Sequence, residues 1–268
     1  MHLLPADARL RDGTVLAFVE HGPSDGVPVV FLHGFSDHWR SFMPVLPHLP
    51  PRVRAVAVTM RGHGGASQPR AGYAISDFSR DLLEFIDLLR VDRVVLAGHS
   101  LGSAVALQAA IEAPERIAGV VLAPGFASLT GPAVDEFADA VHALTDPIDP
   151  GFVAALQQQA REPQLPSGLF ASMVEHSRRM PSRVWHAVID SVRDFDVAAE
   201  LPRVTAPVLL VWGMRDAFVT GAAQETLLDG LPNTELVVFR AGGHTPHWDD
   251  PGRYGREVGD FAARAFAA

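Results

Sequence analysis

The segment Gly98–Gly102, which reads Gly-His-Ser-Leu-Gly, constrains the fold of this chain more than any other. The apolar run Val94–Ala97 before it is typical of a buried strand, and Ser100–Ala113 is typical of a helix packed on a sheet. Because glycine tolerates close backbone approach, this sharp strand-to-helix turn lifts the Ser100 hydroxyl clear of the sheet. The unpaired N–H groups at the start of the helix point at the same place. Ser100 is therefore the candidate nucleophile.

The same glycine–serine–glycine spacing occurs at Gly22–Gly26. That stretch contains Pro, Ser, Asp and Gly between two strand-like runs, and no helical pattern follows it. We therefore expect Ser24 to lie in a turn and to have no catalytic role.

Strand-like and helix-like stretches alternate along most of the chain, which favours an α/β fold with a mainly parallel sheet covered by helices on both faces. Several strands are almost entirely apolar, as expected for strands buried on both sides. The expected strands are Val15–Glu20, Val27–Leu32, Val53–Thr59, Val94–Ala97, Gly119–Leu122, Val208–Trp212 and Glu235–Phe239. The expected helices are Ser76–Arg90, Ser100–Ala113, Thr220–Leu231 and Pro251–Phe266. Ser76 is expected as an N-cap, and Pro251 suits the opening turn of the last helix.

The alternation stops between about Pro124 and Leu201, where the pattern is helical and no convincing strand occurs, and it resumes at Pro207. We expect residues 125–200 to be a helical cap inserted over the carboxyl edge of the sheet. Residues 1–124 and 201–268 would then form the two parts of the core. The alternative is that the inserted helices complete the outer layer of the sheet.

Composition excludes several classes of function. The net charge is −9 and no basic block occurs, so no nucleic-acid partner is expected. The chain contains no Lys and no Cys, which excludes Schiff-base and thiol chemistry, the lysine of phosphate-binding loops, disulfides and thiolate metal sites. The longest apolar runs are too short to cross a membrane, and Met1–Asp7 lacks the features of a secretory signal. A cytoplasmic location without membrane partners is therefore expected.

A serine hydroxyl needs a base to take its proton, and the base needs an acid to fix its tautomer. In an open parallel sheet these groups should follow strands, at the carboxyl edge. Asp216 follows the strand Val208–Trp212, and His244 follows the strand Glu235–Phe239 through a pair of glycines. The resulting chain order of serine, aspartate and histidine is the one associated with this type of serine turn.

Other residues compete for these two roles. Asp216 could instead initiate the helix that follows it, and the chain contains 12 histidines. His99 is fixed inside the turn, and its side chain is expected to point away from Ser100. His247 lies a step further from the end of its strand. We therefore expect His244 to be the base.

An oxyanion requires two N–H donors aimed at one point. The backbone N–H of Leu101, directly after the serine, is the first candidate. The second comes from His33-Gly34-Phe35, which follows the strand Val27–Leu32. Gly34 permits an unusual backbone conformation, so the Phe35 N–H is expected to face the site. The alternative is that these residues form only a tight turn.

Five motifs, in this order, resemble the α/β-hydrolase superfamily over nearly the whole chain. They are His33-Gly34-Phe35, Arg61-Gly62-His63-Gly64, Gly98-His99-Ser100-Leu101-Gly102, Gly213-Met214-Arg215-Asp216 and Gly243-His244. The resemblance implies an eight-stranded, mostly parallel sheet flanked by helices with an inserted helical cap. The strand missing from the seven runs is expected from a hairpin in the region Gly13–Gly22. Thr59 departs from the family, which usually has an aspartate there, and this change is expected to affect the loop rather than the chemistry.

A serine nucleophile disfavours the members with an aspartate at this position, haloalkane dehalogenases and epoxide hydrolases. The chain is similar to small esterases and enol-lactonases. The resemblance therefore implies a serine hydrolase that cleaves a carboxylic ester or lactone of a small substrate through an acyl-enzyme, without a cofactor or metal. The candidate pocket residues given below favour an apolar substrate. A small-molecule receptor with slow hydrolysis, a cofactor-free perhydrolase and a hydrolase of carbon–carbon bonds are alternatives. A metallohydrolase built on His244, His247 and Asp249, with His33, is disfavoured because these residues lack a recognised zinc pattern.

Specificity is expected to come from the insertion and the loops around the site. The candidate residues of an apolar pocket are His33, Gly34, Trp39, Phe126, Met173, Trp185 and Phe218, together with Phe35, His38 and Phe170. Each of them could equally belong to the core.

Overall fold

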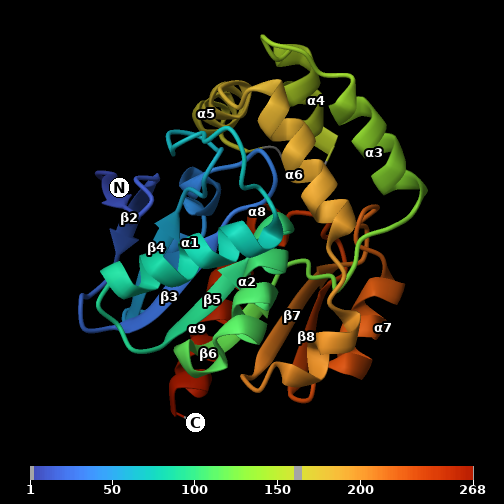
Figure 1. Cartoon of the computed structure of the whole chain (residues 1–268). Coiled ribbons are helices and arrows are strands. Elements are labelled where there is room, and N and C mark those ends of the chain that lie inside the picture. Colours follow the sequence, from blue (N-terminus) through green and yellow to red (C-terminus); the bar gives the residue numbers. More distant parts are fainter. Residues whose placement is uncertain (1–2, 160–164, 268) are drawn as a thin grey trace.

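The sheet begins with an antiparallel hairpin and continues as parallel strands (Figure 1). The computed structural model describes residues 3–159 and 165–267. Within these residues, eight strands follow the order β1-β2-β4-β3-β5-β6-β7-β8. β2 pairs antiparallel with β1 and β4, and the other neighbours are parallel. The strands are β1 (Ala6–Arg9), β2 (Val15–His21), β3 (Val27–Leu32), β4 (Val53–Val58), β5 (Val94–Gly98), β6 (Ile117–Leu122), β7 (Val208–Gly213) and β8 (Thr234–Phe239). The predicted eight-stranded, mostly parallel sheet is confirmed.

The eighth strand lies further upstream than expected. The region Gly13–Gly22 supplies β2, but its hairpin partner is Ala6–Arg9, of which only Ala8 is buried. A short edge strand with mostly exposed side chains carries no apolar pattern, which is why the sequence did not reveal it.

Helices cover both faces of the sheet. α1 and α2 pack together on one face, whereas α9 lies on the other face against β3, β5 and β6. All five residues of β5 and all six of β6 are buried, which explains their continuous apolar sequences. The helices of the core are α1 (Ile75–Leu88), α2 (Leu101–Glu112), α7 (Gly221–Gly230), α8 (Pro246–Asp249) and α9 (Pro251–Ala267). Short 3-10 helices lie at η1 (Trp39–Phe42), η2 (Leu46–His48) and η3 (Pro114–Arg116).

One helix start was predicted wrongly. Ala74, not Ser76, is the N-cap of α1, because the Asp77 carboxylate accepts the Ala74 N–H at 3.1 Å and closes the first turn from within the helix. Pro251 opens α9, as predicted.

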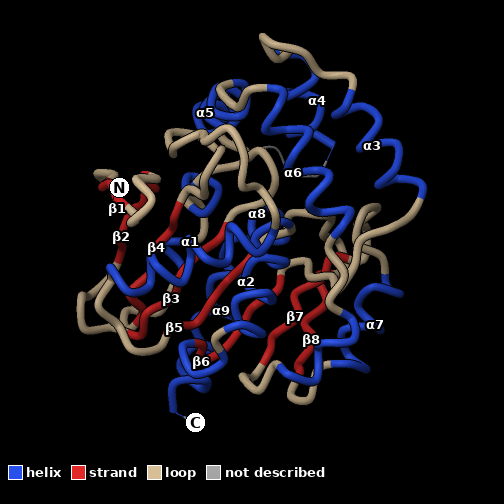
Figure 2. The backbone as a smooth tube through the Cα atoms, in the orientation of Figure 1, coloured by secondary structure: helices blue, strands red, loops and turns tan. Residues whose placement is uncertain are grey.

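The segment between β6 and β7 contains helices and lies beyond the ends of the strands, at the top of Figures 1 and 2. Its helices are α3 (Pro132–His142), α4 (Pro150–Gln159), α5 (Ser167–Arg178) and α6 (Ser182–Asp194). The 3-10 helix η4 (Ala198–Arg203) follows them and packs against α7 and α2 of the core. α3 packs on α6, and α4 packs on α5. Ser128 and Asp196 form an isolated antiparallel bridge, so the chain enters and leaves the segment at the same place. We call residues 125–200 the insertion.

Across the described residues, no helix combines the length and the apolar character that a membrane span requires.

Candidate active site

Ser100 lies at the junction of β5 and α2 in a strained conformation. Its φ is 50° and its ψ is −112°, values that a residue other than glycine rarely adopts. The glycines on either side have no room for a side chain: a Cβ on Gly98 would collide with the backbone of Gly102, and a Cβ on Gly102 would collide with the carbonyl group of Leu32. Ser24, in contrast, lies in the turn between β2 and β3.

Asp216 and His244 come together at the ends of β7 and β8. His244 Nδ1 lies 2.9 Å from Asp216 Oδ2 and 3.1 Å from Oδ1. The Asp216 side chain is fully buried, and its Oδ1 also accepts the N–H groups of Phe218 at 2.8 Å and Val219 at 3.0 Å. Burial opposes ionisation, but His244 and these two N–H donors outweigh it and lower the pKa of Asp216. The charged carboxylate therefore holds Nδ1–H, and Nε2 is the ring nitrogen left for chemistry.

Two backbone N–H groups are available beside Ser100. Within the part of the chain that the structure describes, neither Leu101 N–H nor Phe35 N–H has a hydrogen-bond partner. A Cβ on Gly34 would collide with the His99 imidazole, and the next residues turn sharply, with φ of 64° at Ser36. Leu101 and Phe35 line the same cavity as Ser100 and His244. This arrangement can bind an oxyanion between the two loops.

The other histidines near the site are neutral and engaged. His99 contributes to the lining of the cavity, and its Nε2 lies 3.0 Å from the His244 carbonyl oxygen. Burial, reinforced by His244, lowers the pKa of His99 to about 3. His247 is fully buried, its Nε2 lies 3.0 Å from Ser41 Oγ, and burial also lowers its pKa. Of these three imidazoles, His244 is the one with a carboxylate on Nδ1.

One cluster of potential metal ligands occurs among the described residues. Asp37, His99 and His247 have ligand atoms within 4.8 Å of one another. It shares only His247 with the disfavoured metallohydrolase set. Asp249 Oδ2 instead accepts the Gly243 N–H at 2.8 Å, which shapes the loop before His244.

The cavity at Ser100 has a volume of about 90 Å³ and a mostly apolar wall. Its lining residues are Phe35, Ser36, Asp37, His99, Ser100, Leu101, Leu129, Val134, Phe137, Leu156, Gln157, Ile189, Val192, Phe218, His244, Thr245 and Trp248. Of the predicted pocket residues, Phe218 and Phe35 are in this wall. The aliphatic side chains of the insertion were not predicted as pocket residues, and their spacing on α3 and α6 was the available signal.

Six of the predicted pocket residues, His33, Gly34, Trp39, Phe126, Met173 and Trp185, do not line the cavity, and neither do His38 and Phe170. Several lie one layer behind it: the Trp185 ring centre is 4.9 Å from that of Phe35, and Met173 packs with Trp248. Others stabilise the fold. His33 Nε2 accepts the Met60 N–H at 3.0 Å, and Gly34 makes room for His99.

The other predicted pocket residues that do not line the cavity also pack inside the fold. Trp39 belongs to the core on the α9 side, and Phe126 packs against Phe195 in the other core. His38 contacts His176, with ring centres 4.0 Å apart and ring planes tilted by 45°, and Phe170 lies at the edge of the small Met173 cluster. Large size and apolarity do not separate a pocket wall from the layer that supports it.

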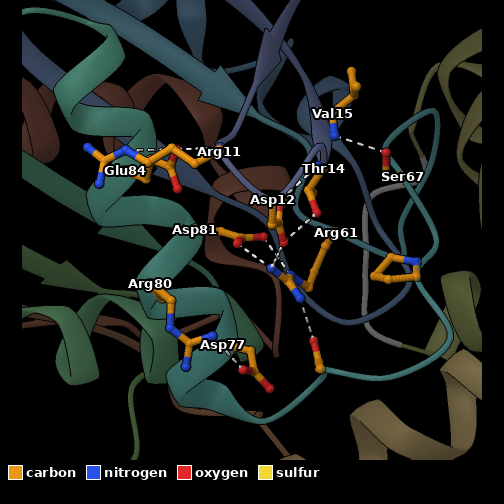
Figure 3. Close-up of polar contacts among 12 residues, drawn as sticks. Arg11, Asp12, Thr14, Val15, Arg61, Ser67, Asp77, Arg80, Asp81 and Glu84 are labelled. Atoms are coloured by element: carbon orange, nitrogen blue, oxygen red, sulfur yellow. Dashed lines mark hydrogen bonds and ion pairs between the residues drawn. The ribbon is translucent and has the colours of Figure 1, made fainter.

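The Arg61 motif supports the loop beside the site (Figure 3). Arg61 Nε donates to Asp81 Oδ2 at 2.6 Å, and Arg61 Nη1 donates to the Gly72 carbonyl oxygen at 3.0 Å. Asp12 Oδ2 lies 3.6 Å from Nη2 of the same guanidinium group. Thr59 Oγ1 accepts the Trp39 N–H at 3.2 Å, so the residue that departs from the family still fixes a backbone group.

The insertion is tied to the loop that carries Phe35. Gln157 Nε2 on α4 donates to Asp37 Oδ1 at 2.9 Å. Ser177 Oγ on α5 lies 2.6 Å from the Ser36 carbonyl oxygen and 2.8 Å from the Met173 carbonyl oxygen. The insertion thus supplies much of the apolar wall and also hydrogen-bonds residues 36 and 37 of the loop that carries Phe35.

A strained serine at the turn from β5 to α2 and an aspartate–histidine pair at the ends of β7 and β8 are typical of the α/β hydrolases. Residues 29–257 match the model of the Alpha/beta hydrolase family, and the chain belongs to this family. A relative from Variovorax paradoxus that is named as a carbamate hydrolase, RutD, is 32% identical over 94% of this chain and 97% of its own length.

Solved structures share the fold. An esterase from Exiguobacterium antarcticum superimposes with a TM-score of 0.86 and 22% identity, covering 97% of this chain and 100% of that one. The enol-lactonase of Burkholderia xenovorans has a TM-score of 0.79 and 20% identity, covering 96% of this chain and 100% of that one. The predicted membership of the superfamily is confirmed, and hydrolase activity follows from the family.

Proposed function

We propose that this chain is a serine hydrolase that cleaves a carboxylic ester or lactone of a small, apolar substrate through an acyl-enzyme. The observation that carries the proposal is that Ser100, held at positive φ, and His244, held by the buried Asp216, line one cavity. No cofactor takes part. The insertion serves as a cap, because α3, α4 and α6 form the wall that faces Ser100.

The mechanism follows from the positions of these groups. His244 Nε2 takes the proton from Ser100 Oγ as the oxygen attacks the substrate carbonyl carbon. The N–H groups of Phe35 and Leu101 hold the oxyanion. His244 then gives the proton to the departing alcohol oxygen. In the second half of the reaction His244 takes a proton from a water molecule, the water oxygen attacks the acyl carbon, and His244 returns the proton to Ser100 Oγ as the acid leaves. Asp216 keeps the ring in the required tautomer and stabilises its charged form.

A carbamate is the second candidate substrate, because the relative at 32% identity is named as a carbamate hydrolase. The same serine chemistry would then pass through a carbamoyl-enzyme. A receptor with slow hydrolysis, a perhydrolase and a carbon–carbon bond hydrolase use the same residues and differ in turnover and substrate.

The test starts with a fluorophosphonate probe, which labels an activated serine. We expect the adduct to map to Ser100, and we expect Ser100→Ala to lose labelling and about 10⁶-fold in kcat. A panel of nitrophenyl esters, enol-lactones and aryl carbamates then identifies the bond. Labelling at another residue, or a loss below tenfold in Ser100→Ala, would remove Ser100 from the mechanism. Single turnover without release would favour a receptor.

A further inference from the structure

A second hollow lies against the catalytic cavity and is lined mainly by residues of α3 and α4. We call it the α3–α4 groove. Its volume is about 240 Å³. Its lining residues are Ala133, Glu136, Phe137, Ala140, Phe152, Ala155, Leu156 and Phe218. Phe137, Leu156 and Phe218 also line the catalytic cavity, so these three side chains form the partition between the two spaces.

The partition consists of these three side chains, and its two aromatic rings pack edge to face. The ring centre of Phe137 lies 5.8 Å from that of Phe218 and 5.7 Å from that of Phe35. The three partition residues are only half-buried. Rotation of a side chain about its own bonds needs no movement of the helices, and it is fast where the side chain is exposed. The partition can therefore open without unfolding any part of the insertion.

The catalytic cavity alone is small. A volume of about 90 Å³ has room for on the order of six to nine water-sized groups. An ester with a longer chain must extend beyond it, and the neighbouring apolar space is the α3–α4 groove. Glu136, which is charged and exposed, lies on the groove and would repel an anionic chain end.

The position of Phe218 decides which end of the substrate enters the groove. The Phe218 ring centre lies 5.4 Å from that of His244. In serine hydrolysis the base gives its proton to the leaving oxygen, so the leaving alcohol lies beside the imidazole. The chain attached to that oxygen is therefore the one that faces Phe218 and the groove.

Resting on the hydrolase chemistry proposed above, we propose that the α3–α4 groove binds the alcohol portion of the substrate, a neutral apolar chain. Phe137, Leu156 and Phe218 form the gate between the groove and the cavity. When Ser100 Oγ forms its bond to the acyl carbon, the bond from that carbon to the alcohol oxygen breaks, and the oxygen takes the proton held on His244. The alcohol then leaves through the groove.

The experiment measures kcat/KM for two series of esters: butyrates of ethanol to octanol, and ethyl esters of acids from butyrate to decanoate. A fully buried methylene is worth about fourfold, and the groove is partly open to water. We expect hexyl butyrate to exceed ethyl butyrate by at least about tenfold, with a smaller rise in the acyl series. Ala155→Trp, which fills the groove from α4, should bring the hexyl-to-ethyl ratio close to one. Ala140→Trp does the same from α3 and replaces it if Ala155→Trp does not fold.

The matched control is Ala171→Trp, which places the same ring at an exposed alanine of α5 outside the groove and should keep the wild-type ratio. An unchanged ratio in both groove variants, or a rise only with acyl length, would overturn the proposal. If no ester is cleaved, the proposed function fails, but calorimetric binding of 1-hexanol still tests the groove. Binding weakened at least fivefold by Ala155→Trp supports the groove, and equal binding by both proteins refutes it.

Discussion

Replacing Asp216 by Asn separates the charge of this residue from its shape. The Asn side chain can still accept the N–H groups of Phe218 and Val219 through its oxygen, as Asp216 Oδ1 does at 2.8 and 3.0 Å. Its NH₂ group then faces His244 Nδ1, which now lies 2.9 Å from a carboxylate oxygen. A donor at that place forces Nδ1 to accept, so the proton of the neutral ring moves to Nε2. His244 can then no longer take the proton of Ser100.

The expected loss in kcat is about 10⁴-fold, the cost of the wrong tautomer in a serine triad. Stability should fall by about 1 kcal/mol, the difference between a hydrogen bond to a charged group and one to a neutral group. The measurements are steady-state hydrolysis of a nitrophenyl butyrate and urea unfolding of the same preparations. Asp229→Asn, at an exposed position on α7, is the control and should change neither quantity. A folded Asp216→Asn protein with wild-type kcat would refute the assignment of the acid and of the tautomer.

Three further predictions follow from other parts of the structure. Burial lowers the pKa values of His38 and His99 to about 3 and that of His63 to about 4, below the unfolded value of 6.5. The folded state therefore binds fewer protons than the unfolded state below pH 6.5, and the full stability is present only above that pH. As the pH drops toward 4, the free energy of unfolding should fall by up to about 1.4 kcal/mol per pH unit for each of these histidines, as measured by urea unfolding. A pH-independent midpoint between 7 and 5 would contradict this. Gly102→Ala places a Cβ against the Leu32 carbonyl group and should lower the free energy of unfolding by at least about 3 kcal/mol. Gly168→Ala on α5 has open space around it and should leave the stability unchanged or raise it. Similar unfolding midpoints for the two variants would be inconsistent with the close packing of the turn. Ser177→Ala removes a hydrogen bond to the Ser36 carbonyl oxygen that is worth about 1 kcal/mol. The value of kcat/KM should therefore fall about fivefold with an unchanged pH profile, and it should recover in Ser177→Thr. Equal losses of kcat/KM in both variants would indicate a packing role only.

Much of the core could be predicted because its signals are local. Continuous apolar runs gave β3 to β7, and the glycines around Ser100 indicated a turn that has no room for side chains. Asp216 and His244 were located by the rule that functional groups follow parallel strands, and the structure brings their side chains together. Their catalytic roles stay predictions that the variants above test.

The pocket could not be predicted in the same way, because a pocket wall depends on how separate helices are placed. Trp185 and Phe137 are both aromatic residues of the insertion, and both contact Phe35, yet only Phe137 lines the cavity. The surroundings of His99 could not be predicted for a related reason. Its ring occupies space left by Gly34, which is 65 residues away in sequence and adjacent only in the folded sheet.

The position of the insertion explains how one segment can influence both substrate choice and reaction rate. Its aliphatic side chains form one wall of the cavity, so they determine which substrates fit. Its Ser177 and Gln157 also hydrogen-bond residues 36 and 37, directly after the Phe35 N–H that would hold the oxyanion. A shift of α4 or α5 would therefore move an oxyanion donor as well as the wall. Because electrostatic stabilisation depends on donor placement to within a fraction of an ångström, a change in these helices should alter kcat and KM together, whereas a change confined to the outer α3–α4 groove should alter only the preference for the alcohol.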